Sequence, residues 1–188
     1  NGVAINLYTA SEASIPLDGK RIVSVSQNTD YPNSGNVLIG IDPSEPVSFT
    51  LKLRIPSWCK EASIVINGEP SDAECRAGSF SDITRIWSPG DVVSLNMKME
   101  WRLVKGRERQ AGRAAVMRGP VIFCLNPDQD KSLSGIDAAD LGKIVIDRLS
   151  IENAPVNNNS VRPDGMACIL KAGNKPFAMG NTGNLTLK

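Results

Sequence analysis

The chain has 188 residues, a formal net charge of +1 and no histidine. This nearly neutral balance argues against a dedicated nucleic-acid-binding protein, which normally carries a strongly basic domain. Without histidine, the chain lacks the commonest general base, the commonest metal ligand and the Ser-His and Cys-His nucleophile pairs. It also lacks the run of roughly 18 apolar residues that predicts a transmembrane helix. We therefore expect neither nucleic acid nor membrane as a partner.

The N-terminal part of the chain predicts short strands separated by turns. Apolar residues alternate with polar or small ones over residues 3–8, 21–27 and 36–41, and successive side chains of a strand point to opposite faces. The segments between them are rich in Pro, Gly, Asn and Ser, which favour bends. We predict strands at these three segments and a loop or turn over residues 11–20.

The most informative stretch is residues 49–101. It opens with FTLKLRIP and closes with VSLNMKMEW, and every second residue of both runs is apolar. Between them lies the Asn67-Gly68 pair, a strong hairpin signal because both residues tolerate a positive φ. A second turn, Ser-Pro-Gly-Asp, occupies residues 88–91. These patterns predict the core of an antiparallel sheet that is packed on one side.

A basic stretch over residues 102–118 separates this region from the remainder of the chain. Its charged residues are Arg102, Lys105, Arg107, Arg109, Arg113 and Arg118, with Glu108 as the opposing carboxylate. We interpret it as the boundary between two domains, residues 1–105 and residues 106–188, and expect the second to be truncated at its C-terminal end. Binding of an acidic partner or a phosphate is the alternative, although the stretch lacks interleaved aromatic residues and a Gly-rich phosphate loop.

Further short strands are predicted in the C-terminal part. The predicted segments are 114–117, 121–125, 143–151, 166–171 and 185–188, with one helical turn over 136–141. No segment has a sustained apolar period of 3.6 residues, so helix should be scarce. The series of short strands predicts an all-β fold of two consecutive antiparallel β-sandwich domains, jelly-roll or immunoglobulin-like, with very little helix.

Three tryptophans are candidates for a sugar-binding face, because sugars stack on aromatic rings. Trp101 ends an alternating run, Trp58 follows a Pro-Ser bend, and Trp87 precedes the second turn. Tryptophan is more often a packing residue than a ligand platform. A sugar site at Trp58 or Trp87 is therefore the minor alternative to packing.

The cysteines and carboxylates do not form a recognisable site in the sequence. The cysteines are Cys59, Cys75, Cys124 and Cys168. They are too widely spaced for a CxxC motif, so small buried hydrophobes are the favoured interpretation and disulfides the alternative. The carboxylates considered are Asp30, Asp42, Glu69, Asp82, Asp91 and Asp147. Several occur in turns, where they satisfy backbone N–H groups, and no pair of facing carboxyls for a glycosidase can be identified.

Several motifs in a fixed order carry a family resemblance. They are LKLRIPSWCKEASIVINGEP, the WSPGDVV turn, GRAAVMRGPVIFCL, and the earlier Gln-Asn-Thr-Asp-Tyr-Pro segment. Together they resemble the C-terminal region of glycoside hydrolase family 127, the bacterial β-L-arabinofuranosidases and their relatives. The resemblance is strong over residues 1–125 and weak beyond them. Asn33 departs from it, because relatives usually carry Trp after Tyr-Pro.

The resemblance implies a catalytic (α/α)6 barrel followed by two β-sandwich domains. The family's chemistry uses a cysteine nucleophile near a zinc ion and a glutamate acid/base, all of which belong to the barrel. No position of this chain matches that motif, so we assign it no catalytic, cofactor-binding or metal residue. Zinc and arabinose-containing glycans are then expected only in the parent enzyme.

The leading hypothesis is that the chain is a non-catalytic β-sandwich portion of such a hydrolase. It would support the absent barrel of the same polypeptide, and homodimerisation is a second role considered for it. An autonomous carbohydrate-binding module is the alternative, and a general adhesion sandwich is a third reading. The sequence does not distinguish a periplasmic from a cytoplasmic location.

Overall fold

The computed structural model describes residues 2–19, 21–124, 144–147, 150–153, 168–174 and 183–187. The chain divides into two compact units, Asn1–Glu100 and Trp101–Lys188. The structure thus divides the chain after Glu100, whereas the sequence predicts a boundary after residue 105, at the end of the first strand of the second unit. Strands dominate the regular secondary structure of the described residues, which confirms the all-β prediction, and a 3-10 turn, η1 (Glu108–Gln110), lies between β10 (Trp101–Lys105) and β11 (Ala114–Arg118).

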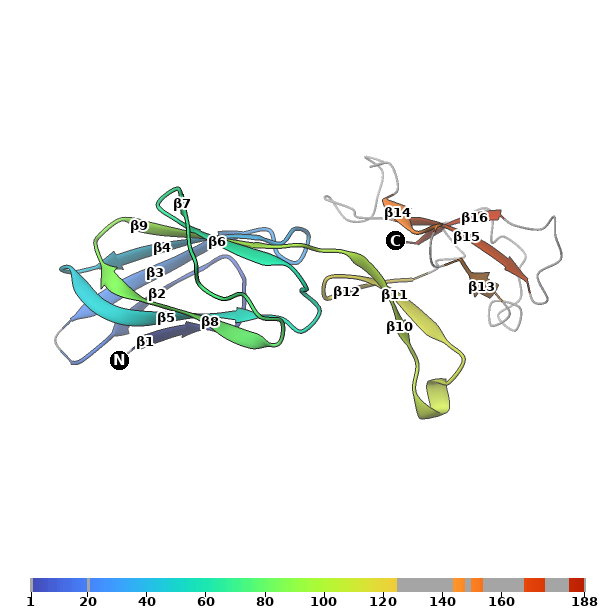
Figure 1. The fold of residues 1–188 in the computed structure, drawn as a ribbon, viewed down its shortest axis with the longest axis horizontal. Coiled ribbons are helices and arrows are strands. Elements are labelled where there is room, and N and C mark those ends of the chain that lie inside the picture. Colours follow the sequence, from blue (N-terminus) through green and yellow to red (C-terminus); the bar gives the residue numbers. More distant parts are fainter. Residues whose placement is uncertain are drawn as a thin grey trace. The chain divides into compact units, whose positions relative to one another are not determined.

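The first unit consists of two sheets (Figure 1). The larger sheet has the strand order β2 (Ser11–Pro16), β3 (Ile22–Thr29), β4 (Asn36–Pro43), β9 (Asp91–Met97), β6 (Ala62–Ile66) and β7 (Glu69–Pro70). The smaller sheet has the order β1 (Gly2–Ile5), β5 (Val47–Ile55) and β8 (Ser79–Trp87). Described neighbours pair antiparallel except β1, which runs parallel to β5 with Gly2 opposite Thr50.

The core of the first unit lies between these two sheets. On β5 every second side chain is buried, including Phe49, Leu51, Leu53 and Ile55, and on β9 the same holds for Val93, Leu95 and Met97. These side chains belong to one contiguous apolar cluster. The alternation in the two predicted runs therefore marks the inward faces of the two sheets, because strand side chains alternate between faces.

Two predicted elements of the first unit are corrected by the structure. The run predicted as one strand over residues 93–101 is interrupted, because β9 ends at Met97 and β10 begins at Trp101. The reason is pairing: β6 begins at Ala62 directly opposite Met97. The loop predicted over residues 11–20 contains β2, an exposed edge strand whose partner among the described strands is β3. An edge strand with few buried side chains lacks the apolar alternation that identifies a strand.

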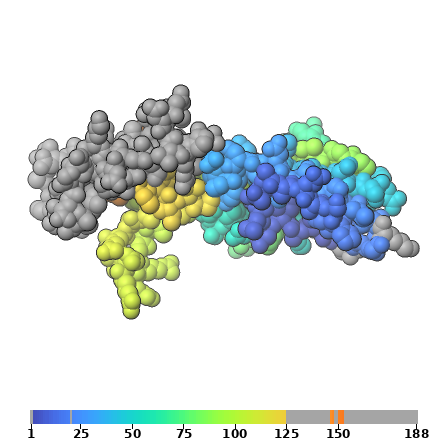
Figure 2. Space-filling view, turned by 180° about the vertical axis from the view of Figure 1, so that it is seen from behind, coloured from blue at the N-terminus to red at the C-terminus, as the bar shows by residue number. Residues whose placement is uncertain are grey.

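The second unit contains two further sheets. One is the antiparallel sheet of β10 (Trp101–Lys105), β11 (Ala114–Arg118) and β12 (Val121–Phe123). The other is formed by β13 (Ile144–Ile146), β15 (Cys168–Asn174), β14 (Glu152–Asn153) and β16 (Gly183–Leu187). Figure 2 shows the connection between β10 and β11 as a protrusion, coloured yellow-green. The helical turn predicted over residues 136–141 lies outside the described residues.

No helix in the described ranges is long and apolar enough to cross a bilayer.

Candidate functional site

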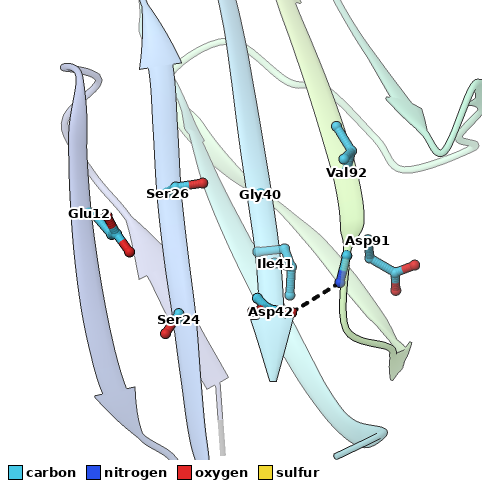
Figure 3. A pocket seen from close by; sticks show the side chains of 9 residues that line it. Glu12, Ser24, Ser26, Gly40, Ile41, Asp42, Asp91 and Val92 are labelled. Atoms are coloured by element: carbon cyan, nitrogen blue, oxygen red, sulfur yellow. Dashed lines mark hydrogen bonds between the residues drawn. The ribbon is translucent and has the colours of Figure 1, made fainter. Parts of the chain in front are cut away.

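A shallow hollow lies on the outer face of the larger sheet of the first unit (Figure 3). Its volume is about 230 Å3. It is lined by Glu12, Ser24, Ser26, Gly40, Ile41, Asp42, Gly90, Asp91 and Val92. The hollow exists because β3 presents serines and β4 presents a glycine at its centre. A Cβ added to Gly40 would lie 2.5 Å from Ser26 Oγ, so a larger residue there would fill the space.

Two turns meet at one end of the hollow, where Asp91 joins them. Asn67 Nδ2 donates to Asp91 Oδ1 at 2.7 Å, and the backbone N–H of Ser88 donates to Asp91 Oδ2 at 2.9 Å. In return, Asn67 Oδ1 accepts from the backbone N–H of Val92 at 2.8 Å. Both residues of the Asn67-Gly68 turn have positive φ, 52° and 89°, as the hairpin signal predicts.

Two carboxylates at this hollow, Asp42 and Asp91, accept hydrogen bonds from the backbone and do not face each other as an acid–base pair. Asp42 Oδ1 accepts from the backbone N–H of Gly90 at 3.2 Å, and Figure 3 shows the Asp91 side chain turned away from Asp42. Burial alone would raise the pKa of Asp91, but the hydrogen bonds from Ser88 and Asn67 and the charge of Arg85 lower it. A general acid of a glycosidase needs a raised pKa. The lowered pKa of Asp91 does not fit that general-acid role, and its hydrogen bonds join the two turns.

The other carboxylates considered in the sequence lie elsewhere on the surface. Asp30 accepts from the Ser34 hydroxyl within its own turn, and Asp82 pairs with Lys52 across β5 and β8. Glu69 and Asp147 are exposed. The structure thus brings together only Asp42 and Asp91 of the six, through the turn that contains Gly90.

The three tryptophan side chains pack against other parts of the protein. Trp87 is fully buried, its indole N–H donates to the Phe49 carbonyl at 3.1 Å, and its ring lies 5.7 Å from that of Phe49. It therefore cannot serve as a sugar platform. Trp58 is half-buried against the core. Trp101 packs edge-on against Phe123 with 4.6 Å between ring centroids.

The cysteines of the described residues do not fit a zinc site. Cys59 is buried and Cys75 is half-buried in the first unit, whereas Cys124 is exposed in the second. Burial raises the pKa of the Cys59 and Cys75 thiols, which favours the neutral form over the thiolate that binds metal. Within the described ranges, no three His, Cys, Asp or Glu side chains converge as a metal site. The side chain of Cys168 lies outside the description.

The basic stretch forms a hairpin. Its residues lie on β10, on β11 and in the exposed connection between them. Arg102 is half-buried, donates to the Gly119 carbonyl and has a pKa lowered by burial. Arg118 lies over the Trp101 ring at 5.9 Å from its centroid. The ends of the stretch are thus structural, and its middle is exposed.

Sequence reasoning missed the hollow, because its residues meet only through strand pairing. Glu12 lies opposite Ser26, Ser26 opposite Gly40, and Gly40 opposite Val92. The alternating serines of RIVSVSQ were visible in the sequence. The register that places them beside a glycine is not apparent from the sequence, which predicts a loop or turn over residues 11–20.

Comparison with known proteins gives one consistent answer. A family model described as "Beta-L-arabinofuranosidase, GH127 middle domain" matches residues 2–99. The curated non-reducing end β-L-arabinofuranosidase of Bifidobacterium longum subsp. longum is 28% identical in an alignment of length 113, which covers 54% of this chain and 16% of that protein.

Solved structures extend the similarity over nearly the whole chain. A GH127 β-L-arabinofuranosidase from Geobacillus stearothermophilus T6 matches with a TM-score of 0.79 at 26% identity, over 99% of this chain and 30% of that one. A structure described as a glycoside hydrolase matches with a TM-score of 0.74 at 26% identity, over 98% of this chain and 32% of that one. The chain therefore spans only 30–32% of the length of these solved relatives.

Proposed function

The chain belongs to glycoside hydrolase family 127, and from this premise we propose that it is the non-catalytic β-sandwich portion of a longer β-L-arabinofuranosidase-like hydrolase. The observation that carries the proposal is the match of residues 2–99 to the family's middle domain, together with coverage of only 30% of a solved relative. The hydrogen bonds of Asp91 to Asn67 and to the Ser88 N–H, which join two turns, also fit a scaffold.

The role proposed for the chain is support of the catalytic (α/α)6 barrel of the same polypeptide. The two sheets of the first unit bury a large apolar cluster, so the sandwich supplies a rigid body on which another domain can pack. The zinc ion and the catalytic cysteine and glutamate that the family resemblance implies would all reside in the barrel. Homodimerisation of the parent is a second role for the same surfaces.

Activity of the isolated chain tests the proposal. We expect the purified chain to hydrolyse no aryl β-L-arabinofuranoside, with or without added zinc, whereas the full-length parent hydrolyses it. Trp87→Ala in the parent should lower its thermal-inactivation temperature without changing KM, because Trp87 is buried within the sandwich core. Turnover by the isolated chain would overturn the proposal.

A carbohydrate-binding module remains the second candidate, and the hollow on the larger sheet favours it. Serine hydroxyls and carboxylates such as Ser26 and Glu12 are groups that hydrogen-bond sugar hydroxyls. Affinity gels containing arabinan would measure this binding, with Gly40→Leu filling the hollow. Retardation that is lost in Gly40→Leu supports the module, and equal mobility in gels with and without arabinan refutes it.

A further inference from the structure

One face of the three-stranded sheet of the second unit exposes apolar side chains, and Arg102 lies opposite Met117 on the same face. Strand pairing puts Val104 beside Ala115, and Met117 beside Ile122, on the same face. Val104 is 42% and Ile122 is 56% exposed. The opposite face is packed, since Val116 and Phe123 are buried there. An apolar cluster left on a sheet face is a mark of an interaction surface.

The connection between β10 and β11 adds positive charge to one end of this face. Lys105, Arg107, Arg109 and Arg113 are all exposed, with Glu108 as the opposing carboxylate. Among the ion pairs of the described residues, none involves these four basic side chains. The whole chain is nearly neutral, with 21 basic and 20 acidic residues. The excess of positive charge is therefore confined to the connection between β10 and β11.

The tip has a defined conformation. The backbone N–H of Gly106 donates to the Arg113 carbonyl at 2.9 Å, and the N–H of Gln110 donates to the Arg107 carbonyl at 2.9 Å. A Cβ on Gly106 would lie 2.1 Å from the Gln110 carbonyl oxygen, so the turn requires glycine. A preformed tip loses little conformational entropy when it binds a partner.

We propose that the β10–β11 hairpin is a docking element, which places its apolar face and its basic tip on an acidic and apolar surface of the catalytic portion of the same polypeptide. This inference rests on the proposed function. About two thirds of the length of the solved relatives lies outside this chain, so a covering surface is available within one polypeptide. Linkage also gives that surface a high effective concentration, in the millimolar range for short linkers.

A second copy of the chain fits this surface less well. The commonest homodimers are two-fold symmetric and bring the same patch of both subunits together. Two basic tips would then lie within one interface, and like charges in proximity are unfavourable.

Amide hydrogen exchange on the chain alone and on the full-length parent tests the inference. Amides of residues 103–117 should exchange at least about tenfold more slowly in the parent. The double variant Arg107→Glu/Arg109→Glu should lose that difference. The matched control Lys60→Glu/Arg76→Glu, at exposed positions of the first unit, should keep it. Increasing the salt concentration should reduce the protection of these amides in the parent, because salt screens the exposed charges of the tip.

The outcomes separate this inference from the proposed function. Equal exchange of the hairpin in both proteins, with protection elsewhere on the chain, overturns the docking hairpin and leaves the scaffold role standing. Equal exchange everywhere overturns both. Protection that grows with the concentration of the chain alone would assign the surface to a second copy and overturn the inference.

Discussion

Replacing Asp91 with alanine tests whether the two turns beside the hollow stabilise the first unit. The Asp91 carboxylate accepts two hydrogen bonds, at 2.7 Å from Asn67 and at 2.9 Å from Ser88. Hydrogen bonds to a charged group contribute about 1.5–3 kcal/mol each, and we take the lower end because both donor residues are exposed. The expected loss in the free energy of unfolding is therefore about 3 kcal/mol. The Arg85 guanidinium, 4.0 Å away, adds little because it is exposed.

The pH dependence gives a second, independent signature. The pKa of Asp91 is lowered in the folded protein, despite burial, by its hydrogen bonds and by Arg85. A carboxyl with a lowered folded pKa stabilises fully above its unfolded pKa, about 3.9, and loses this stabilisation as pH falls through the folded value. The variant Asp91→Asn should therefore be less stable than the unsubstituted chain at pH 7. The difference should shrink below about pH 4, where the wild-type carboxyl also becomes neutral.

Urea unfolding followed by tryptophan fluorescence at pH 7 and pH 3 measures both effects. Asp82→Ala is the matched control, because Asp82 forms an exposed ion pair with Lys52 and such pairs contribute at most about 1 kcal/mol. A loss below about 1 kcal/mol for Asp91→Ala at pH 7 would refute the reasoning. If Asp91→Asn lowers the free energy of unfolding by the same amount at both pH values, the inference that the charge of Asp91 stabilises the fold is refuted.

Three further substitutions or labels probe the first unit. Trp87→Ala should lower the free energy of unfolding by about 3–5 kcal/mol, measured by urea, because it removes a buried ring; a loss under about 1 kcal/mol contradicts this packing. Gly35→Ala should lower Tm, since the new Cβ would lie 1.8 Å from the Met97 carbonyl oxygen; an unchanged Tm is the contrary result. Iodoacetamide should label Cys124 well before Cys59, as peptide mapping would reveal, because Cys59 is buried; equal rates would contradict its burial.

Much of the first unit was predictable because its core strands carry a local signal. The alternation over Phe49 to Ile55 and over Val93 to Met97 corresponds to buried side chains on two facing sheets. The Asn67-Gly68 pair has the positive φ angles that its hairpin signal requires. In each case the determining physics lies within a few residues of chain.

The site was less predictable because its geometry depends on pairing between distant segments. Asp91 was recognisable as a turn carboxylate, and its bond to the Ser88 N–H confirms that interpretation. Its bond to Asn67 joins two turns that are separate in sequence. β2 was missed because an exposed edge strand needs no apolar face. The hollow at Gly40 follows only once β2, β3, β4 and β9 are in register.

The parallel strand β1 has a consequence for the order of folding. A parallel pair cannot be closed by a tight turn, and β1 reaches β5 only after the chain has passed through β2, β3 and β4 of the other sheet. Its partner therefore emerges from the ribosome long after β1 itself. The strand that is synthesised earliest in this sheet must wait for a distant segment, so we expect the closure of a long loop to limit the folding rate of the first unit.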